Sequence, residues 1–374
     1  MKTFITKYHS WLYESDYFYN RFNLLATALE EFILNQIIDE MSAKQVSTQF
    51  ESVLKRCDDI DFEDYYTAIA YVILHFLPRY HLFQLAFSKL LDKHILPYNT
   101  KKRNDILDIG TGPAPALYAL SDVYESLIQF GVLKEDFQYI PDYVEPSSGF
   151  RHFLHNFTEL INYKNAGKEK WVVPYHHGSF SKLDDIEFDL PIIDYWGRRR
   201  YIKHRYNIII SANFFTRLSQ VEKQEHKIRE CARYLRNKGL LIVLGAQSKN
   251  RNNQDKSYYD IYGRLREIIE NSNYSTNRIK AKAKRCKVKR NIISFDYSSR
   301  FAGRIKEFHK KIISTLEQYN AINAITSKEV KKKLLDIVED DYKFTYKTEV
   351  HVFIKSSYPR FLVKKNNKYL RRMK

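Results

Sequence analysis

The residues best suited to chemistry lie in one short stretch, DILDIGTGPAPA, at positions 105–116. An apolar run carries one acid, Asp108, and two glycines follow it, Gly110 and Gly112, with Thr111 between them. Glycine lets the backbone approach a ligand closely, and proline suits the first turn of a helix, whose opening N–H groups lack partners within the helix. The stretch therefore predicts a strand, a glycine loop and a helix whose N-terminus binds a nucleotide.

The neighbouring residues narrow the kind of nucleotide. A dinucleotide fingerprint places its third glycine where Pro115 stands, which argues against NAD. Asp108, at the tip of the strand, can order the loop or contact a cationic ligand, and S-adenosylmethionine carries an ammonium and a sulfonium group. Glu145 ends the second predicted strand, where a carboxylate can accept hydrogen bonds from both hydroxyls of a ribose. We therefore expect S-adenosylmethionine as the cofactor; the other interpretation of Glu145 is a solvated acid at a strand end.

Residues 101–250 supply the elements that position these groups. Apolar strands alternate there with helices, which is typical of a parallel sheet covered on both faces. A charged stretch at 184–205 is expected to be an insertion, and a helix at 221–235 is expected to end at Gly239. The predicted strands are residues 105–109, 137–144, 171–175, 206–211 and 240–244.

The segments on either side of residues 101–250 differ from them in glycine content and in the spacing of apolar residues. Residues 1–100 contain no glycine and carry apolar residues at three- and four-residue spacing, which predicts an all-helical N-terminal extension. Pro78 is expected to end one of these helices, and Arg79 and Tyr80 after it could face a cofactor carboxylate. Residues 251–363 are expected to add helices and strands that complete the sheet, with a final strand in 343–355, before a basic tail at 364–374.

Composition bounds the partners and the compartment. The formal net charge of +18 indicates an anionic partner, most often nucleic acid, although a solvated basic surface is the other interpretation. Cys57, Cys231 and Cys286 lie far apart, so neither a disulfide framework nor a metal site is predicted. No apolar run is long enough to span a membrane, and the N-terminus lacks the apolar stretch of a signal peptide. We therefore expect a cytoplasmic protein that does not insert into a membrane.

The basic residues are concentrated in a few stretches. Between 280 and 290 they nearly alternate, so that an extended strand would present one cationic face that neutralises phosphates without reading sequence. Arg198–Arg200, together with Lys203 and Arg205, and the tail could extend this track, and tyrosines are available for stacking on bases. We expect nucleic acid as the partner, RNA in preference to DNA; solvated loops are the alternative. The expected contact residues are Lys280, Lys282, Lys284, Arg285, Lys287, Lys289 and Arg290.

Four motifs in order carry a resemblance to a known family. DIGTGP at 108–113, VEP at 144–146, NIIISAN at 207–213 and LRNKGLLIVL at 235–244 resemble the motif series of class I S-adenosylmethionine-dependent methyltransferases. Within that superfamily, LDIGTGPAPALYA at 107–119 is most similar to the methyltransferase-like family associated with the mitochondrial and bacterial small ribosomal subunit. The resemblance implies an α/β fold with a Rossmann-like class I methyltransferase sheet.

The resemblance also implies roles for particular residues. Asp108, Gly110 and Gly112 would line the methionine end of the cofactor, and Glu145 would hold its ribose. The family usually has glycine where Ala114 stands, and many members carry a cysteine cluster after the fifth strand. This chain has neither, so no iron–sulfur site is implied. The other implied cofactor contacts are Ser179 and Phe180 beside the adenine, and Ser211 and Asn213 next to the transferred methyl group.

The acceptor is less constrained than the cofactor. Methyltransferases that act on base amino groups often show two prolines after the Asn or Asp that ends strand four, whereas this chain reads NFFT at 213–216. Methyl transfer needs little acid–base help when the nucleophile is good, because alignment supplies much of the rate, and no catalytic residue is assigned. We expect methyl transfer to RNA, with ribosomal RNA as the finer form of this expectation. The alternatives are a non-catalytic methyltransferase-like scaffold that binds RNA, and a methyltransferase for a small molecule or a protein.

Overall fold

The structure of the protein is a computed structural model. It describes residues 2–56, 60, 62–97, 103–164, 179–193, 197–203, 205–245, 258–272, 289–294, 300–339 and 347–355.

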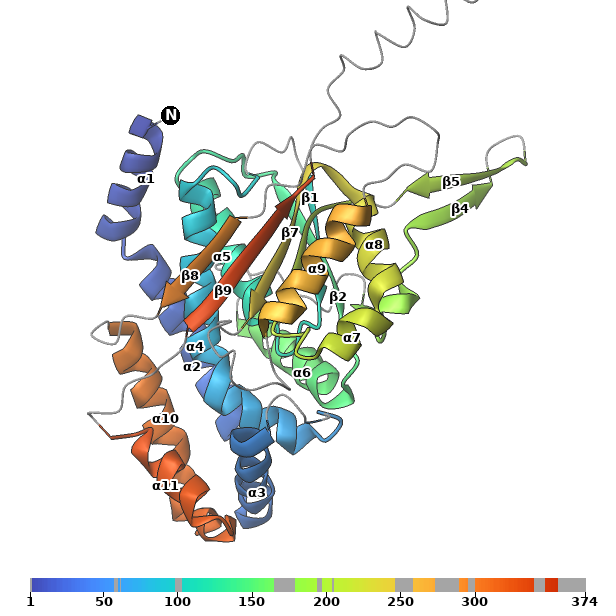
Figure 1. Cartoon of the computed structure of the whole chain (residues 1–374). Helices are drawn as coiled ribbons and strands as arrows, with labels where there is room; N and C mark the ends of the chain where they lie inside the picture. Colours follow the sequence, from blue (N-terminus) through green and yellow to red (C-terminus); the bar gives the residue numbers. More distant parts are fainter. Residues whose placement is uncertain are drawn as a thin grey trace, which may run out of the picture.

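A seven-stranded sheet forms the centre of the described part of the chain, with strand order β3-β2-β1-β6-β7-β9-β8 (Figure 1). Strands β3, β2, β1, β6 and β7 are parallel to one another, and β9 runs antiparallel to both β7 and β8. This is the predicted α/β fold with a Rossmann-like sheet, and it resembles the methyltransferase fold. The strands are β1 Arg103–Ile109, β2 Gln138–Val144, β3 Ser179–Phe180, β6 Tyr206–Ala212, β7 Leu235–Gly245, β8 Lys289–Ser294 and β9 Lys347–Ile354.

The shared direction of the parallel strands gives the sheet two chemically different edges. We call the edge at which β1, β2, β6 and β7 end the carboxyl edge, and the edge at which they begin the amino edge. In open parallel sheets ligands bind outside the carboxyl ends of the strands. The glycine loop follows β1 and therefore lies at the carboxyl edge.

Side-chain alternation along the strands separates two apolar layers. Along β7, Leu240 and Ile242 belong to one buried cluster, whereas Leu241 and Val243 belong to the other. The first layer packs under α4, α5 and α6, and the second under α7, α8 and α9, on the opposite face (Figure 1). These helices are α4 Tyr65–Asp92, α5 Pro115–Gln129, α6 Ser148–Lys164, α7 Leu218–Lys223, α8 Glu225–Tyr234 and α9 Tyr258–Ser272.

The N-terminal region is helical, as predicted, and helices from the C-terminal region pack against it. Helix α10 contacts α2 and α4, and α11 contacts α3, while strands β8 and β9 join the sheet. The region after α9 therefore contributes both to the sheet and to the helical layer. None of the described helices is long and apolar enough to span a membrane. The remaining helices are α1 Lys2–Glu14, α2 Tyr17–Leu34, α3 Glu40–Arg56, α10 Arg300–Gln318 and α11 Lys328–Asp336.

Two predicted helix ends were wrong. Pro78 lies inside α4, which continues to Asp92, because both sides of the proline are packed: Leu77 and Tyr80 are fully buried. Gly239 does not end a helix either, since α8 ends at Tyr234 and Gly239 lies within β7.

The third strand and the insertion also differ from expectation in detail. The strand predicted at 171–175 lies outside the described residues; the strand beside β2 is β3, Ser179–Phe180. The expected insertion at 184–205 contains an antiparallel hairpin of β4 Asp189–Ile193 and β5 Arg199–Lys203, which projects beyond α8 (Figure 1).

A buried polar cluster joins the helical layer to the sheet domain. The Asp122 carboxylate on α5 accepts hydrogen bonds from Arg21 Nε on α2 at 2.8 Å, from Gln84 Nε2 on α4 at 2.7 Å and from the Tyr80 hydroxyl. Arg21 is 3% exposed and Asp122 is fully buried. Because a buried charge is costly without its partners, this cluster fixes how α2 and α4 lie on α5.

Replacing Arg21 with Met tests this cluster, because it leaves the Asp122 charge buried without its cation. We expect the free energy of unfolding in urea to fall by about 3 kcal/mol. The matched control is Lys55→Met, which breaks the exposed i,i+4 pair with Glu51 and is expected to cost less than about 1 kcal/mol. Equal losses in the two variants would contradict the role given to Asp122.

Candidate cofactor site

The glycine loop after β1 is tied to the end of β2. Gly110 and Gly112 have positive φ values of 68° and 55°, which glycine adopts without steric cost. The N–H groups of Gly110 and Thr111 both donate to the Val144 carbonyl, at 2.8 and 3.1 Å. The loop therefore holds the ends of β1 and β2 together and brings Asp108 close to Glu145.

Ala114 adopts a conformation that usually requires glycine. Its φ is 63°, it occupies the position before α5, and its side chain is fully buried. A left-handed conformation costs an L-residue roughly 1–2 kcal/mol. Pro115 follows as the first residue of the helix, as predicted. The chain thus keeps the backbone shape of a glycine-rich loop at a position where this sequence has alanine.

Asp108 is fully buried and only partly satisfied. Its Oδ2 accepts a hydrogen bond from the Thr111 hydroxyl at 2.7 Å. Its Oδ1 is buried and has no hydrogen-bond partner among the described residues. Burial raises the pKa of Asp108 to about 7, and the nearby charge of Glu145 adds to this rise while the Thr111 bond opposes it. Asp108 therefore has a free acceptor atom in a place where an anion is unstable alone.

Glu145, at the end of β2, is 3% exposed and closes the loop from the other side. Its Oε2 accepts from the N–H of Gly112 at 2.7 Å, and its Oε1 accepts from the N–H of Ser147 at 2.9 Å. Burial raises its pKa to about 7, against the hydrogen bonds from Ser147 and Gly112. Its predicted role in holding a ribose stays a prediction; the contacts show that it also orders the glycine loop.

Asp108 and Glu145 are two buried carboxylates at the same edge, and the charge of Arg151 lowers the pKa of Glu145. The charge of Glu145 raises the pKa of Asp108, and no described group of three or more His, Cys, Asp or Glu residues is arranged to hold a metal. A ligand with a positive charge would lower both pKa values and would supply a partner for Asp108 Oδ1. The electrostatics of this edge therefore fit a cationic ligand.

The residues predicted to lie beside an adenine are next to Glu145. β3 pairs with the end of β2, and the N–H of Glu145 donates to the Phe180 carbonyl at 2.9 Å. Ser179 is exposed and Phe180 is partly buried. The structure thus brings both residues to the same edge as the carboxylates.

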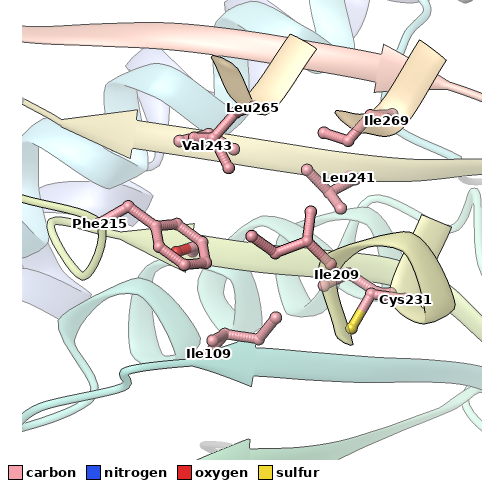
Figure 2. A pocket seen from close by; sticks show the side chains of 10 residues that line it. Ile109, Ile209, Phe215, Cys231, Leu241, Val243, Leu265 and Ile269 are labelled. Atoms are coloured by element: carbon pink, nitrogen blue, oxygen red, sulfur yellow. The ribbon is translucent and has the colours of Figure 1, made fainter. Parts of the chain in front are cut away.

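The two residues predicted to flank the methyl group are placed differently. Asn213 follows β6 at the carboxyl edge with φ 56°, and its N–H donates to the Leu244 carbonyl at 2.8 Å. The side chain of Ser211, by contrast, lies in the apolar layer under α8 and α9, and its buried hydroxyl has no hydrogen-bond partner among the described residues. Figure 2 shows Ile109, Ile209 and Cys231 of this layer. The structure does not bring Ser211 together with Asp108, because the two side chains point to opposite faces of the sheet.

Phe214 is a residue of the site that sequence reasoning did not identify. Its side chain lies directly against Gly110, so that a Cβ at position 110 would overlap it, whereas the nearest atom to such a Cβ at Gly112 is Phe150 Cε2 at 4.0 Å. A ligand that approaches Gly110 from the side on which a Cβ would lie must therefore displace the Phe214 ring. The aromatic pair at 214–215 was visible in the sequence, but its direction depends on the left-handed conformation of Asn213.

Arg79 and Tyr80 do not act together at the cofactor site. Tyr80 is fully buried and donates to Asp122, which corrects the expectation that it faces the cofactor. Arg79 lies over the ring of Tyr71, with its Cζ 5.0 Å from the ring centre, and Tyr71 contacts Phe150 at 5.2 Å between ring centres. The Arg79 guanidinium therefore contacts an aromatic group that also includes Phe150, the residue nearest to a Cβ at Gly112.

Most of the predicted nucleic-acid contacts lie outside the described residues. This holds for Lys280, Lys282, Lys284, Arg285 and Lys287. The other two, Lys289 and Arg290, begin β8. The basic tail is also outside the described part of the chain.

Comparisons with known proteins show similarity of fold. No protein-family model matches the chain, and no curated protein matches its sequence. A putative class I S-adenosylmethionine-dependent methyltransferase from Listeria monocytogenes is 12% identical with a TM-score of 0.42, over 90% of this chain and 89% of that chain. A putative sarcosine dimethylglycine methyltransferase from Galdieria sulphuraria is 15% identical with a TM-score of 0.37, over 83% of this chain and 98% of that chain.

A third similar structure contains S-adenosyl-L-methionine. It is phosphoethanolamine N-methyltransferase 2 from Haemonchus contortus in complex with S-adenosyl-L-methionine, 13% identical with a TM-score of 0.35 over 82% of this chain. The chain spans 60% of the length of that enzyme. These similarities are distant and concern the fold alone.

Replacing Asp108 with Asn tests the electrostatic description of the site. The pKa of Asp108 is raised from near 4 to about 7, so its stabilising contribution is full below pH 4 and is lost as the pH rises to 7. Asp108→Asn removes this loss, and we expect it to raise the free energy of unfolding at pH 8 by about 1–3 kcal/mol, with a smaller gain at pH 5. Thermal unfolding at both pH values measures the difference. The control, Glu187→Gln, changes an exposed acid; an Asp108→Asn variant that is destabilised at pH 8 would contradict the description.

Replacing Phe214 with Ala tests whether the ring restricts access to Gly110. If the ring must be displaced, the binding-competent state is only fractionally populated, and we expect the affinity for S-adenosylmethionine to increase about fivefold. Calorimetric titration measures this, with Tyr163→Ala as the control because Tyr163 is an exposed aromatic residue of α6. Weaker binding by Phe214→Ala would show instead that the ring packs against the ligand.

Proposed function

We propose that the protein binds S-adenosylmethionine at the carboxyl edge and is a methyltransferase. The observation that carries this proposal is the buried pair of Asp108 and Glu145, which bracket the glycine loop with one carboxylate oxygen free. The distant likeness to methyltransferase structures agrees with this but does not add to it. Bound S-adenosylmethionine supplies a sulfonium-activated methyl carbon.

The residues of the chain would divide the binding task. Asp108 Oδ1 accepts from the cationic end of the ligand, while its Oδ2 stays with Thr111. The open face of Gly112 lets the backbone come close to the ligand. Glu145 holds the ribose with the oxygens that now accept from the N–H groups of Gly112 and Ser147. Phe180 borders the adenine, next to Glu145.

For the acceptor we propose RNA. The net charge of +18 supports a polyanionic substrate, and ribosomal RNA is the finer form of the proposal, supported by the resemblance of residues 107–119 to the ribosomal-subunit-associated family. No side chain of the described residues is assigned as a general base. Alignment of the acceptor with the methyl carbon would supply much of the rate.

A non-catalytic RNA-binding scaffold is the second candidate function. One observation favours it: the Phe214 ring lies against Gly110, where the cofactor would need access to the backbone. A methyltransferase for a small molecule or a protein is the remaining alternative, in which the basic charge would be incidental.

Transfer of tritiated methyl groups tests the proposal directly. Purified full-length protein is incubated with labelled S-adenosylmethionine and with separate fractions of total RNA, total DNA and total protein. We expect label in RNA, and a loss of at least about 100-fold in Asp108→Asn, because that variant lacks the carboxylate for the cationic ligand. Label in protein alone would overturn the choice of RNA. Binding of RNA without transfer in any fraction would favour the scaffold.

A further inference from the structure

The amino edge of the sheet carries a group of exposed cations, of which Arg205 alone belonged to a predicted basic stretch. We call it the amino-edge patch. It is centred on the first residues of β1, β6 and β7, opposite the edge that holds Asp108 and Glu145. All its members are exposed: Arg103, Arg205, Arg233, Arg236 and Lys238.

A buried acid organises two of these cations. Asp105 accepts from Arg103 Nε at 2.6 Å and from Arg236 Nη2 at 2.5 Å. The acid side chain is 3% exposed, whereas those of Arg103 and Arg236 are 55% and 45% exposed. One shielded carboxylate therefore holds two guanidinium groups in place, and the pair keeps a net positive charge toward solvent.

The guanidinium groups held by Asp105 retain donors for a ligand. Among the described residues, Arg103 donates through its Nε alone, which leaves both of its terminal nitrogens for a ligand. Arg236 uses Nη2 together with Nε, which donates to the Arg205 carbonyl at 3.0 Å. Planar guanidinium groups suit phosphate oxygens, to which they can donate two parallel hydrogen bonds. Holding the side chains in advance reduces the entropy lost when a ligand binds.

The reversed strand β9 brings further basic sequence to the same edge. Ile354, the last residue of β9, pairs with Leu240, and the N–H of Lys238 donates to the Lys355 carbonyl at 3.0 Å. The chain therefore leaves β9 at the amino edge, and the basic tail follows later in the sequence. β8 begins farther along the sheet, because Lys289 pairs with Val352, which pairs with Ile242, level with Asp108 of β1.

Acidic residues limit the patch on two sides. Glu135 and Asp136 are exposed just before β2, and Asp189 lies at the root of the β4–β5 hairpin, where it accepts a hydrogen bond from the Tyr234 hydroxyl at 2.5 Å. The surplus of positive charge is thus confined to the starts of β1, β6 and β7.

We propose that the amino-edge patch is a docking surface for the phosphate backbone of RNA, separate from the site of methyl transfer. The choice of RNA among nucleic acids rests on the proposed function; the location and chemistry of the surface do not. Seven residues of β1 at about 3.3 Å each place the two edges roughly 20 Å apart. The patch therefore holds a part of the RNA other than the acceptor nucleotide, and it holds it without reading sequence.

The test compares charge-removal variants of the full chain in binding to a fluorescein-labelled RNA hairpin, measured by anisotropy between 50 and 200 mM salt. We expect Arg103→Gln/Arg236→Gln to bind about tenfold more weakly, with a shallower dependence on salt because about two phosphate contacts are lost. Arg205→Gln/Lys238→Gln is the second variant, since it leaves both partners of Asp105 in place and keeps the test valid if the first variant folds poorly. We expect it to weaken binding severalfold.

The control pair is Lys310→Gln/Lys328→Gln, which removes the same charge from exposed positions on α10 and α11. Equal losses in the control and the patch variants would overturn the proposal, as would unchanged binding in both patch variants. Binding to anionic lipid vesicles, lost in the patch variants, with no binding to RNA would assign the patch to a membrane surface instead and would also overturn it.

The same variants separate this proposal from the proposed function. The patch variants are expected to bind S-adenosylmethionine with the affinity of the unmodified protein, and Asp108→Asn is expected to bind the RNA hairpin normally. If no variant binds the cofactor while the patch variants still lose RNA, the methyltransferase proposal fails and the docking surface stands.

Discussion

The common direction of strands β1, β2, β6 and β7 is the constraint on which the rest of the structure depends. It gathers the residues that follow these strands at one edge and those that begin them at the other. The carboxyl edge thereby receives Asp108, the glycine loop and Glu145, and the amino edge receives Arg103 and Arg236. One sheet therefore separates a buried anionic site from an exposed cationic surface.

The buried acids at the carboxyl edge are costly for the protein without a ligand. Burial raises the pKa of both Asp108 and Glu145, and the charge of Glu145 raises that of Asp108 further. Sites that store this kind of strain are commonly functional, since a ligand of opposite charge relieves it. The left-handed Ala114 and the close contact between Phe214 and Gly110 lie in the same region. Of the described non-glycine residues with left-handed backbone, Ala114 and Asn213 thus lie close to where the ligand is proposed to bind.

Much of the sheet could be predicted from the sequence, because its signals are local. Runs of apolar residues predicted β1, β6 and β7, and the alternation of polar and apolar residues predicted β9. The errors came from tertiary packing. Burial on both sides lets α4 continue through Pro78, and hydrogen bonds of Lys238 and Gly239 with Lys355 take the residues around Gly239 into a strand.

The site could be predicted in part for the same reason. Residues that follow directly from a strand end, such as Asp108 and Glu145, are placed by the sheet, and the structure brings them together as the sequence suggested. The orientation of Ser211 and Phe214 was not predictable in this way, because it depends on which face a strand residue takes and on the backbone conformation of Asn213. The contact between Asp105 and Arg236, which holds Arg236 beside Arg103, joins residues 131 positions apart and has no local signal in the sequence.

The most direct test of the central claim is calorimetric titration of the unmodified full-length protein with S-adenosylmethionine at pH 7, in two buffers of different ionisation enthalpy. Because Asp108 and Glu145 both have a pKa of about 7, each is partly protonated in the free protein, and a cationic ligand lowers both pKa values. We expect binding with release of protons, seen as a difference in the heat of binding between the two buffers. Binding without proton release, or no binding, would contradict it.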